Sequence, residues 1–150
     1  MKKILFILFC CVLVLSITGC GSSKNDFEVG DKSDVQISDN GVSLSIKDGT
    51  LKNTGGTLVL KNSIDSTLFY DDVYEMEIRQ DNEWHKINIE ANFNGPLWEL
   101  KENSQEDIEL NWEHIYGKLV PGEYRIVKEV YFENEEDQKF YIAVEFEIKK

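Results

Sequence analysis

The sequence predicts an all-β protein: a seven-stranded antiparallel sandwich with Greek-key connections, preceded by a signal peptide and a flexible tether. Three observations support this fold class. From residue 41 onward apolar residues alternate with polar ones, which is the period of half-buried strands. Turn-forming pairs such as Asp81-Asn82 and Pro121-Gly122 separate the runs. No stretch of the chain has the caps and period of a long helix, so two layers of sheet are the expected architecture.

The first 19 residues have the layout of a secretory signal peptide. Lys2 and Lys3 precede an apolar run of 14 residues from Ile4 to Ile17, and the run ends at Thr18-Gly19-Cys20. A membrane-spanning helix needs about 20 apolar residues, so a permanent transmembrane anchor is the weaker interpretation. The cysteine after small residues resembles the lipobox of bacterial lipoproteins. That resemblance implies that Cys20 becomes a diacylated N-terminus at the outer face of the cell membrane, and an ordinary cleaved leader is the alternative.

Removal of this leader would simplify both the cysteine content and the charge. Cys10 and Cys11 would leave with it, so the remaining domain could form no intramolecular disulfide and would depend on its hydrophobic core. The whole chain has 16 basic and 28 acidic residues, a net charge of -12, and loss of Lys2 and Lys3 makes the remainder more acidic still. Nucleic acid is excluded as a partner, because phosphate backbones are bound by clusters of Lys and Arg.

Residues 20–40 are predicted to be a disordered tether that carries the lipidated cysteine. This segment is polar, acidic and poor in large apolar residues, so it cannot bury enough surface to fold by itself. Val35 and Ile37 alternate with polar neighbours, which would allow part of the tether to dock as an extra edge strand. The folded domain is then expected over residues 41–150.

Seven strands are predicted within this domain. Each is a short run of alternating apolar and polar residues bounded by turn residues. The last run is the clearest, because Phe140, Ile142 and Val144 share one face with Phe146 and Ile148. A short helical turn is expected near residues 113–117. The strands are expected at 42–46, 57–61, 74–79, 84–89, 107–112, 124–132 and 140–149.

The connection before the sixth strand contains the strongest signal for a particular sandwich. Pro121-Gly122 forms a turn two residues before Tyr124, which opens the strand. This arrangement resembles the tyrosine corner of Greek-key sandwiches, in which the phenol hydroxyl bonds to backbone a few residues upstream. We therefore interpret Tyr124 as a structural residue and not as part of a functional site.

Two stretches resemble a bacterial immunoglobulin-like domain family found in Gram-positive lipoproteins. Tyr116-Gly117-Lys118-Leu119 followed by residues 122–128 is similar to the closing half of that domain, and residues 41–58 are similar to its first two strands. The resemblance covers roughly residues 41–149, and residues 90–99 do not align with it. It implies an immunoglobulin-like sandwich at the cell surface, and it carries no catalytic residues to transfer.

Few residues suit catalysis or metal binding. His85 and His114 are the only histidines, and no serine lies in a Gly-x-Ser-x-Gly elbow, so we expect no enzyme and assign no catalytic residue and no cofactor. The acidic pair Asp71-Asp72 and the four acidic residues within 133–137 could supply oxygen ligands to calcium. The Asp-x-Asp-x-Asp-Gly loop pattern is absent, however, so no metal site is assigned.

Aromatic residues in predicted connections are the candidate partner-binding residues: Phe93, Trp98, Phe69 and Tyr70. Exposed aromatics on rigid supports often bind partners, but apolar loop residues also fold back to close the end of a sandwich. The alternation of Trp98 with Leu100 favours such a plug, whereas the flanking asparagines favour exposure of Phe93. The predicted function is a lipid-anchored surface module that binds an envelope protein or carbohydrate, or has a structural role. A calcium-dependent or ligand-sensing module is the alternative, and an enzyme is third.

Overall fold

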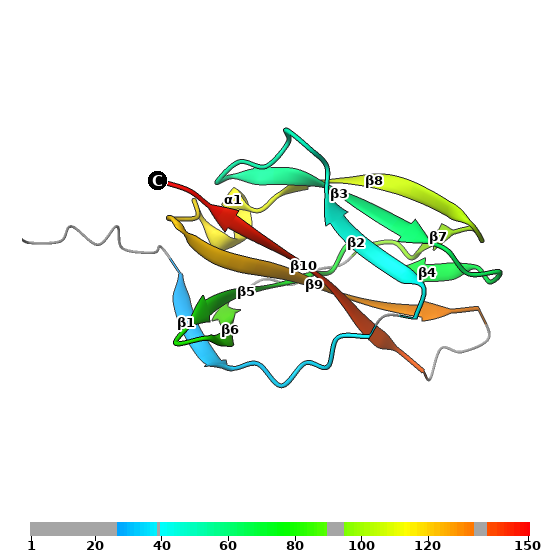
Figure 1. The fold of residues 1–150 in the computed structure, drawn as a ribbon, viewed down its shortest axis with the longest axis horizontal. Helices are drawn as coiled ribbons and strands as arrows, with labels where there is room; N and C mark the ends of the chain where they lie inside the picture. Colours follow the sequence, from blue (N-terminus) through cyan, green and yellow to red (C-terminus); the bar gives the residue numbers. More distant parts are fainter. Residues whose placement is uncertain (1–26, 39, 90–94, 134–137) are drawn as a thin grey trace, which may run out of the picture.

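The protein is an antiparallel β-sandwich in which a three-stranded sheet lies over a larger sheet (Figure 1). The computed structural model describes residues 27–38, 40–89, 95–133 and 138–150. The predicted signal peptide and Cys20 therefore lie outside the described residues. Within the described part no helix is long and apolar enough to cross a membrane. The elements are β1 (Glu28–Lys32), β2 (Val42–Ile46), β3 (Gly55–Asn62), β4 (Leu68–Tyr70), β5 (Glu75–Gln80), β6 (Glu83–Asn88), β7 (Trp98–Leu100), β8 (Ser104–Asn111), α1 (Glu113–Tyr116), β9 (Gly122–Phe132) and β10 (Phe140–Ile148).

The long strand β9 organises the larger sheet. β10 pairs along one edge of β9 from Gly122 to Val130. The other edge is shared, because β5 pairs with the first half of β9 and β4 pairs with its last three residues. β6 and β1 continue the sheet beyond β5, and β7 continues it beyond β4. The larger sheet therefore divides into two arms along β9, one ending at β1 and the other at β7.

The smaller sheet has the order β2-β3-β8 and covers the core. Its inner residues, such as Leu44, Leu58 and Leu60, are buried against Ile126 and Ile142 of the larger sheet's inner face, within one cluster. Trp112 lies at the end of β8 and stacks on Phe146 with ring centres 5.5 Å apart. Burial of these side chains supplies the main stabilisation of a domain that has no disulfide among its described residues.

All seven predicted strands are present, with ends within three residues of those expected. The turn at Asp81 and Asn82 is confirmed, because both residues have positive φ (51° and 64°), as a tight hairpin between β5 and β6 requires. The helical turn α1 is confirmed as well. The prediction of seven strands is nevertheless wrong in number, since the described residues form ten. β4 and β7 were missed because runs of three residues are too short to show a period of two.

The prediction of a disordered tether over residues 20–40 is wrong for the part that the structure describes beyond Phe27. β1 pairs with β6 at one edge of the larger sheet. Residues 33–38, which we call the N-terminal strap, then cross the outer face of this sheet to the opposite edge, where Ile37 pairs in parallel with Tyr141 of β10 (Figure 1). The sequence predicted docking around Ile37. It did not predict β1, because Val29 is the only large apolar residue in that strand.

Candidate functional site

Two large apolar side chains are exposed next to each other at the end of the arm formed by β4 and β7. Leu97 is 55% exposed and Trp98 is 46% exposed. Trp98 begins β7, which pairs with β4 so that Trp98 lies opposite Tyr70. Because β7 is the last strand of its arm, Trp98 lies at an edge of the sandwich.

The Trp98 side chain is held in place although it is exposed. Its indole Nε1 donates a hydrogen bond of 2.8 Å to Oδ1 of Asp72. The chain before Trp98 also packs against this carboxylate, because a Cβ atom built on Gly95 would lie 2.6 Å from Asp72 Oδ2. A residue larger than glycine would therefore displace Asp72 or the chain. We call Asp72, Leu97 and Trp98 the Trp98 surface.

The segment that carries Asp72 is fastened to the core by a buried lysine. Lys128 is only 2% exposed, and its Nζ donates hydrogen bonds to the carbonyl oxygens of Asp71 (2.7 Å) and Val73 (2.9 Å). These carbonyls lie in the connection between β4 and β5, where β9 changes from one strand partner to the other. The Lys128 ammonium group thus donates hydrogen bonds to backbone carbonyls in the region where β9 changes from pairing with β5 to pairing with β4.

Burial determines the ionisation of this lysine. Desolvation lowers the pKa of Lys128 from 10.5 to about 8, and the negative charges of Asp71 and Asp72 act in the opposite direction. The Lys128 ammonium also lies 5.4 Å from the ring centre of Tyr70, which fits a cation–π contact. Lys128 is therefore engaged inside the protein and is not available at the surface.

A buried asparagine positions the other end of β7. Asn62, at the end of β3, donates from Nδ2 to the carbonyl oxygens of Ser66, Leu100 and Lys101 at 2.8, 3.3 and 3.1 Å. Its Oδ1 accepts a hydrogen bond from the backbone of Ile64. β7 is thus linked to the smaller sheet as well as to β4, which makes its first residue a rigidly supported position.

The four aromatic candidates from the sequence have different environments. Tyr70 is 4% exposed in the core, so its prediction as a partner-binding residue is wrong. Phe69 is half-buried in β4, where its ring stacks on Tyr131 at 5.6 Å, so its placement in a loop is wrong as well. Trp98 is exposed, which contradicts its expected role as a plug. Phe93 lies outside the described residues.

Tyr124 makes the contact that a tyrosine corner requires. Its hydroxyl donates a 2.9 Å hydrogen bond to the carbonyl oxygen of Val120, four residues upstream. A second buried tyrosine, which the sequence analysis missed, lies in α1. The Tyr116 hydroxyl donates to the carbonyl oxygen of Tyr74 at 3.1 Å and accepts from the backbone of Met76 at 3.2 Å. Both tyrosines fasten connections to the core.

An ion pair lies buried beneath the N-terminal strap. Arg125 of β9 donates from Nε to Glu77 of β5 at 2.5 Å, and the Glu77 side chain is fully buried. Ser33 of the strap donates its hydroxyl to the second Glu77 oxygen at 2.5 Å. The Arg125 guanidinium also lies 4.9 Å from the ring centre of Trp84. The sequence analysis missed this cluster, whose only signal was charged residues within two strands that pair side by side.

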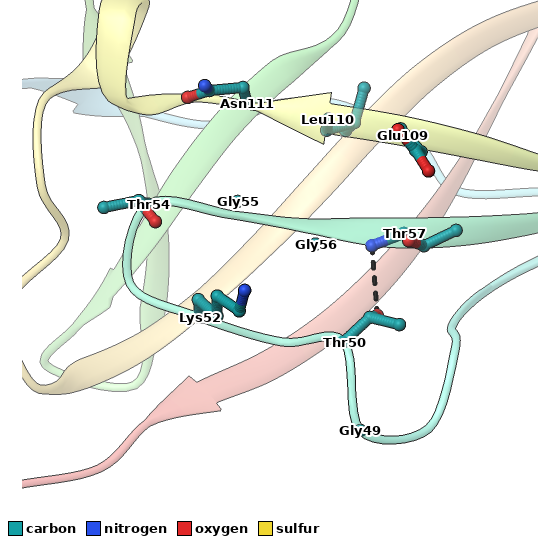
Figure 2. Close-up of a pocket in the computed structure, with 10 residues that line it drawn as sticks. All are labelled: Gly49, Thr50, Lys52, Thr54, Gly55, Gly56, Thr57, Glu109, Leu110 and Asn111. Atoms are coloured by element: carbon teal, nitrogen blue, oxygen red, sulfur yellow. Dashed lines mark hydrogen bonds between the residues drawn. The ribbon is translucent and has the colours of Figure 1, made fainter.

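A shallow groove lies at the other end of the smaller sheet, between the β2–β3 connection and the end of β8 (Figure 2). Its volume is about 410 Å³. Thr50 stabilises its wall by accepting a hydrogen bond from the backbone of Thr57 and donating one to the Lys47 carbonyl. Gly55 lies so close to the backbone of β8 that a Cβ atom there would clash with the Leu110 carbonyl oxygen, and no aromatic side chain is among the residues that line the groove. The lining residues are Gly49, Thr50, Lys52, Thr54, Gly55, Gly56, Thr57, Glu109, Leu110 and Asn111.

The two histidines and the Asp71-Asp72 pair lie apart in the described part of the chain. His85 lies in β6, where a ring nitrogen is 3.2 Å from the carbonyl oxygen of Gly30 in β1. His114 is exposed on α1. No group of three or more His, Cys, Asp or Glu side chains in the described ranges converges on a position that could hold a metal. In the Asp71-Asp72 pair, one carboxylate accepts from the backbone of Val73 and the other from Trp98.

The fold defines an antiparallel β-sandwich with an exposed tryptophan at one edge, and comparison with known families identifies its class. Residues 38–147 match the family model of the bacterial Ig-like domain, and the chain belongs to this family. Domains of this family are typically non-catalytic surface or structural modules. No curated protein matches the chain.

Proposed function

We propose that this protein is an exported, lipid-anchored module of the bacterial envelope that binds a partner through the Trp98 surface. The sequence Ile17-Thr18-Gly19-Cys20 after a short apolar run supports lipid attachment at Cys20. Two acyl chains hold a protein durably at the membrane, and the acidic domain would be repelled by anionic headgroups. The sandwich would thus be held at the outer face of the cell membrane with its edge strands free to meet envelope proteins or carbohydrate.

A single observation carries the binding half of the proposal: Trp98 is exposed and rigid at the same time. An exposed aromatic side chain normally loses rotamer freedom when it binds. The hydrogen bond to Asp72 has already restricted the indole, so less entropy is lost on contact with a partner. Large, preorganised aromatics of this kind carry much of the energy of protein interfaces.

The anchoring half can be tested with Cys20→Ser. Serine cannot take the thioether-linked lipid, so the variant should either be released from cells or remain as an uncleaved precursor. Partitioning of cell extracts between detergent and aqueous phases would distinguish the lipidated form from the unmodified one. Detergent partitioning by the variant at the size of the mature wild-type protein would refute lipid attachment at Cys20.

The binding half can be tested by placing a photoreactive residue at Leu97 of the full chain in intact cells. Illumination should yield a discrete cross-linked adduct, and a second change, Trp98→Ala, should abolish it. The same probe at Asp48 serves as the control, since Asp48 is exposed beyond the far end of β2. Trp98→Ala should leave the unfolding midpoint nearly unchanged, because the side chain lies outside the core. Equal labelling at both positions, or persistence of the adduct without Trp98, would refute the binding role.

A further inference from the structure

Among the described residues, Trp84 and Trp98 each lie close to carboxylate groups, and at Trp84 arginine side chains link the ring to the carboxylates. At Trp84, the guanidinium of Arg125 lies 4.9 Å from the ring centre and is paired with Glu77. The guanidinium of Arg79 lies 5.7 Å from the same ring and pairs with Glu123 at 3.3 Å. In each case one guanidinium interacts with an aromatic face and a carboxylate together, which is a favourable arrangement for this group.

The second pairing, Trp98 with Asp72, lacks the guanidinium. Asp72 Oδ1 accepts the indole hydrogen bond, and no Lys or Arg among the described residues forms an ion pair with this carboxylate, although its negative charge acts on the buried Lys128. In the described part of the chain no Lys or Arg lies over the Trp98 ring. Lys128, which lies behind this segment, is engaged by backbone carbonyls and Tyr70. The exposed indole and the carboxylate thus present the two groups that a guanidinium binds, and no guanidinium of the described residues lies between them.

The charge of the molecule favours a basic partner. The chain has a net charge of -12, so an anionic partner would be repelled as it approached. Next to Trp98, Glu99 is exposed, and Glu102 follows shortly after β7, with Lys101 as the nearby basic residue. An arginine suits the site better than a lysine, because its planar guanidinium stacks on an aromatic face and can pair with a carboxylate at the same time.

We propose that the Trp98 surface takes the side chain of an arginine in a basic peptide segment of the partner protein. The guanidinium would stack on the exposed face of Trp98 and pair with Asp72, as Arg125 does with Trp84 and Glu77. This inference rests on the proposed binding function and names the chemistry of the partner. It assigns the partner to the proteins and not to the neutral glycans.

The test is a titration of the full chain, in detergent micelles, with short peptides while the indole N–H signals are followed by NMR. The probe is the capped pentapeptide Gly-Gly-Arg-Gly-Gly, and the matched peptides replace arginine with lysine or with citrulline, its neutral isostere. The arginine peptide should shift the Trp98 signal saturably, with the signals of Trp84 and Trp112 little changed. We expect the citrulline peptide to bind about tenfold more weakly and the lysine peptide to lie between them.

Two single substitutions separate the contributions of the site. Asp72→Asn retains an acceptor for the indole but removes the charge, and it should weaken arginine binding about fivefold or more. Asp48→Asn removes one negative charge from the far end of β2 and should leave binding almost unchanged. Equal weakening by both variants would mean that only net charge matters, and it would overturn the proposal.

Two further results would also overturn it. One is equal binding of the arginine and citrulline peptides. The other is a saturable shift of the Trp98 signal by chitotetraose, a neutral oligosaccharide, without any shift by the arginine peptide. If the cross-linked adduct at Leu97 forms in cells while the arginine peptide fails to bind, only the arginine inference is refuted. If the adduct also fails, the binding function is refuted as well.

Discussion

The buried ammonium of Lys128 should make the protein more stable as the pH rises from 7 to 9.5. Folding lowers the pKa of this group from 10.5 to about 8 because burial removes its hydration. Between these two values the unfolded chain holds a proton that the folded protein has released. The unfolded state then binds more protons, and stability increases with pH.

The size of the effect follows from the shift. One pKa unit corresponds to about 1.4 kcal/mol, so burial of the charged form costs about 3 kcal/mol in total. Most of this cost is recovered between pH 8 and 10.5, and a rise of about 1 to 2 kcal/mol is expected by pH 9.5. At higher pH the trend reverses. Burial raises the pKa of Tyr74 and of Tyr124 to about 12, so tyrosines ionise first in the unfolded chain and stability falls above about pH 10.

The assay is urea unfolding followed by tryptophan fluorescence at several values of pH from 7 to 9.5. Lys128→Met retains the length of the side chain but cannot titrate, so its stability should lack the rise. Lys61→Met is the matched control, because Lys61 is exposed on β3 and should leave the rise intact. The reasoning would be refuted if the free energy of unfolding of the wild type did not change with pH over this range. It would also be refuted if the free energy of Lys128→Met rose with pH as steeply as that of the wild type.

Two further substitutions test a local hydrogen bond and a buried ion pair between two strands. Tyr124→Phe should lower the free energy of unfolding by about 1 to 3 kcal/mol, because the Val120 carbonyl loses its donor. Tyr141→Phe should have little effect in the same urea titration, because the Tyr141 hydroxyl contacts only the partly exposed carboxylate of Glu129. Equal midpoints for the two variants would count against the corner. Glu77→Gln should cost about 3 to 5 kcal/mol, because Arg125 would remain buried without its counter-charge. A decrease of less than about 1 kcal/mol in the free energy of unfolding would contradict the burial of the Glu77–Arg125 ion pair.

The sequence predicted the sandwich well because its main strands are long enough to show their period. β10 alternates over nine residues, and the Asp81-Asn82 pair indicates its turn through backbone preference alone. These are local signals, and they depend on neighbours in the chain. The tyrosine corner belongs to the same class, since its two partners are only four residues apart.

The features that were missed depend on contacts between distant residues. Tyr70 and Trp98 look alike in sequence, as aromatics in short apolar runs, yet pairing of β4 with β9 buries the first and the edge position of β7 exposes the second. Lys128 occupies an inward position that the pattern assigns to an apolar residue. It is accommodated because two carbonyls from the β4–β5 connection face it. No local pattern contains this information.

The N-terminal strap has a consequence for the order in which the protein folds. Synthesis delivers the N-terminus first, but Ser33 bonds to Glu77, 44 residues later, and to Arg125, 92 residues later. Ser38 donates its backbone N–H to the carbonyl oxygen of Tyr141 in the last strand. Such distant contacts form late, because loop closure costs entropy before any contact is gained. The first part of the domain to leave the ribosome is therefore the last to be secured, and until Tyr141 arrives it stays accessible to proteases and processing enzymes.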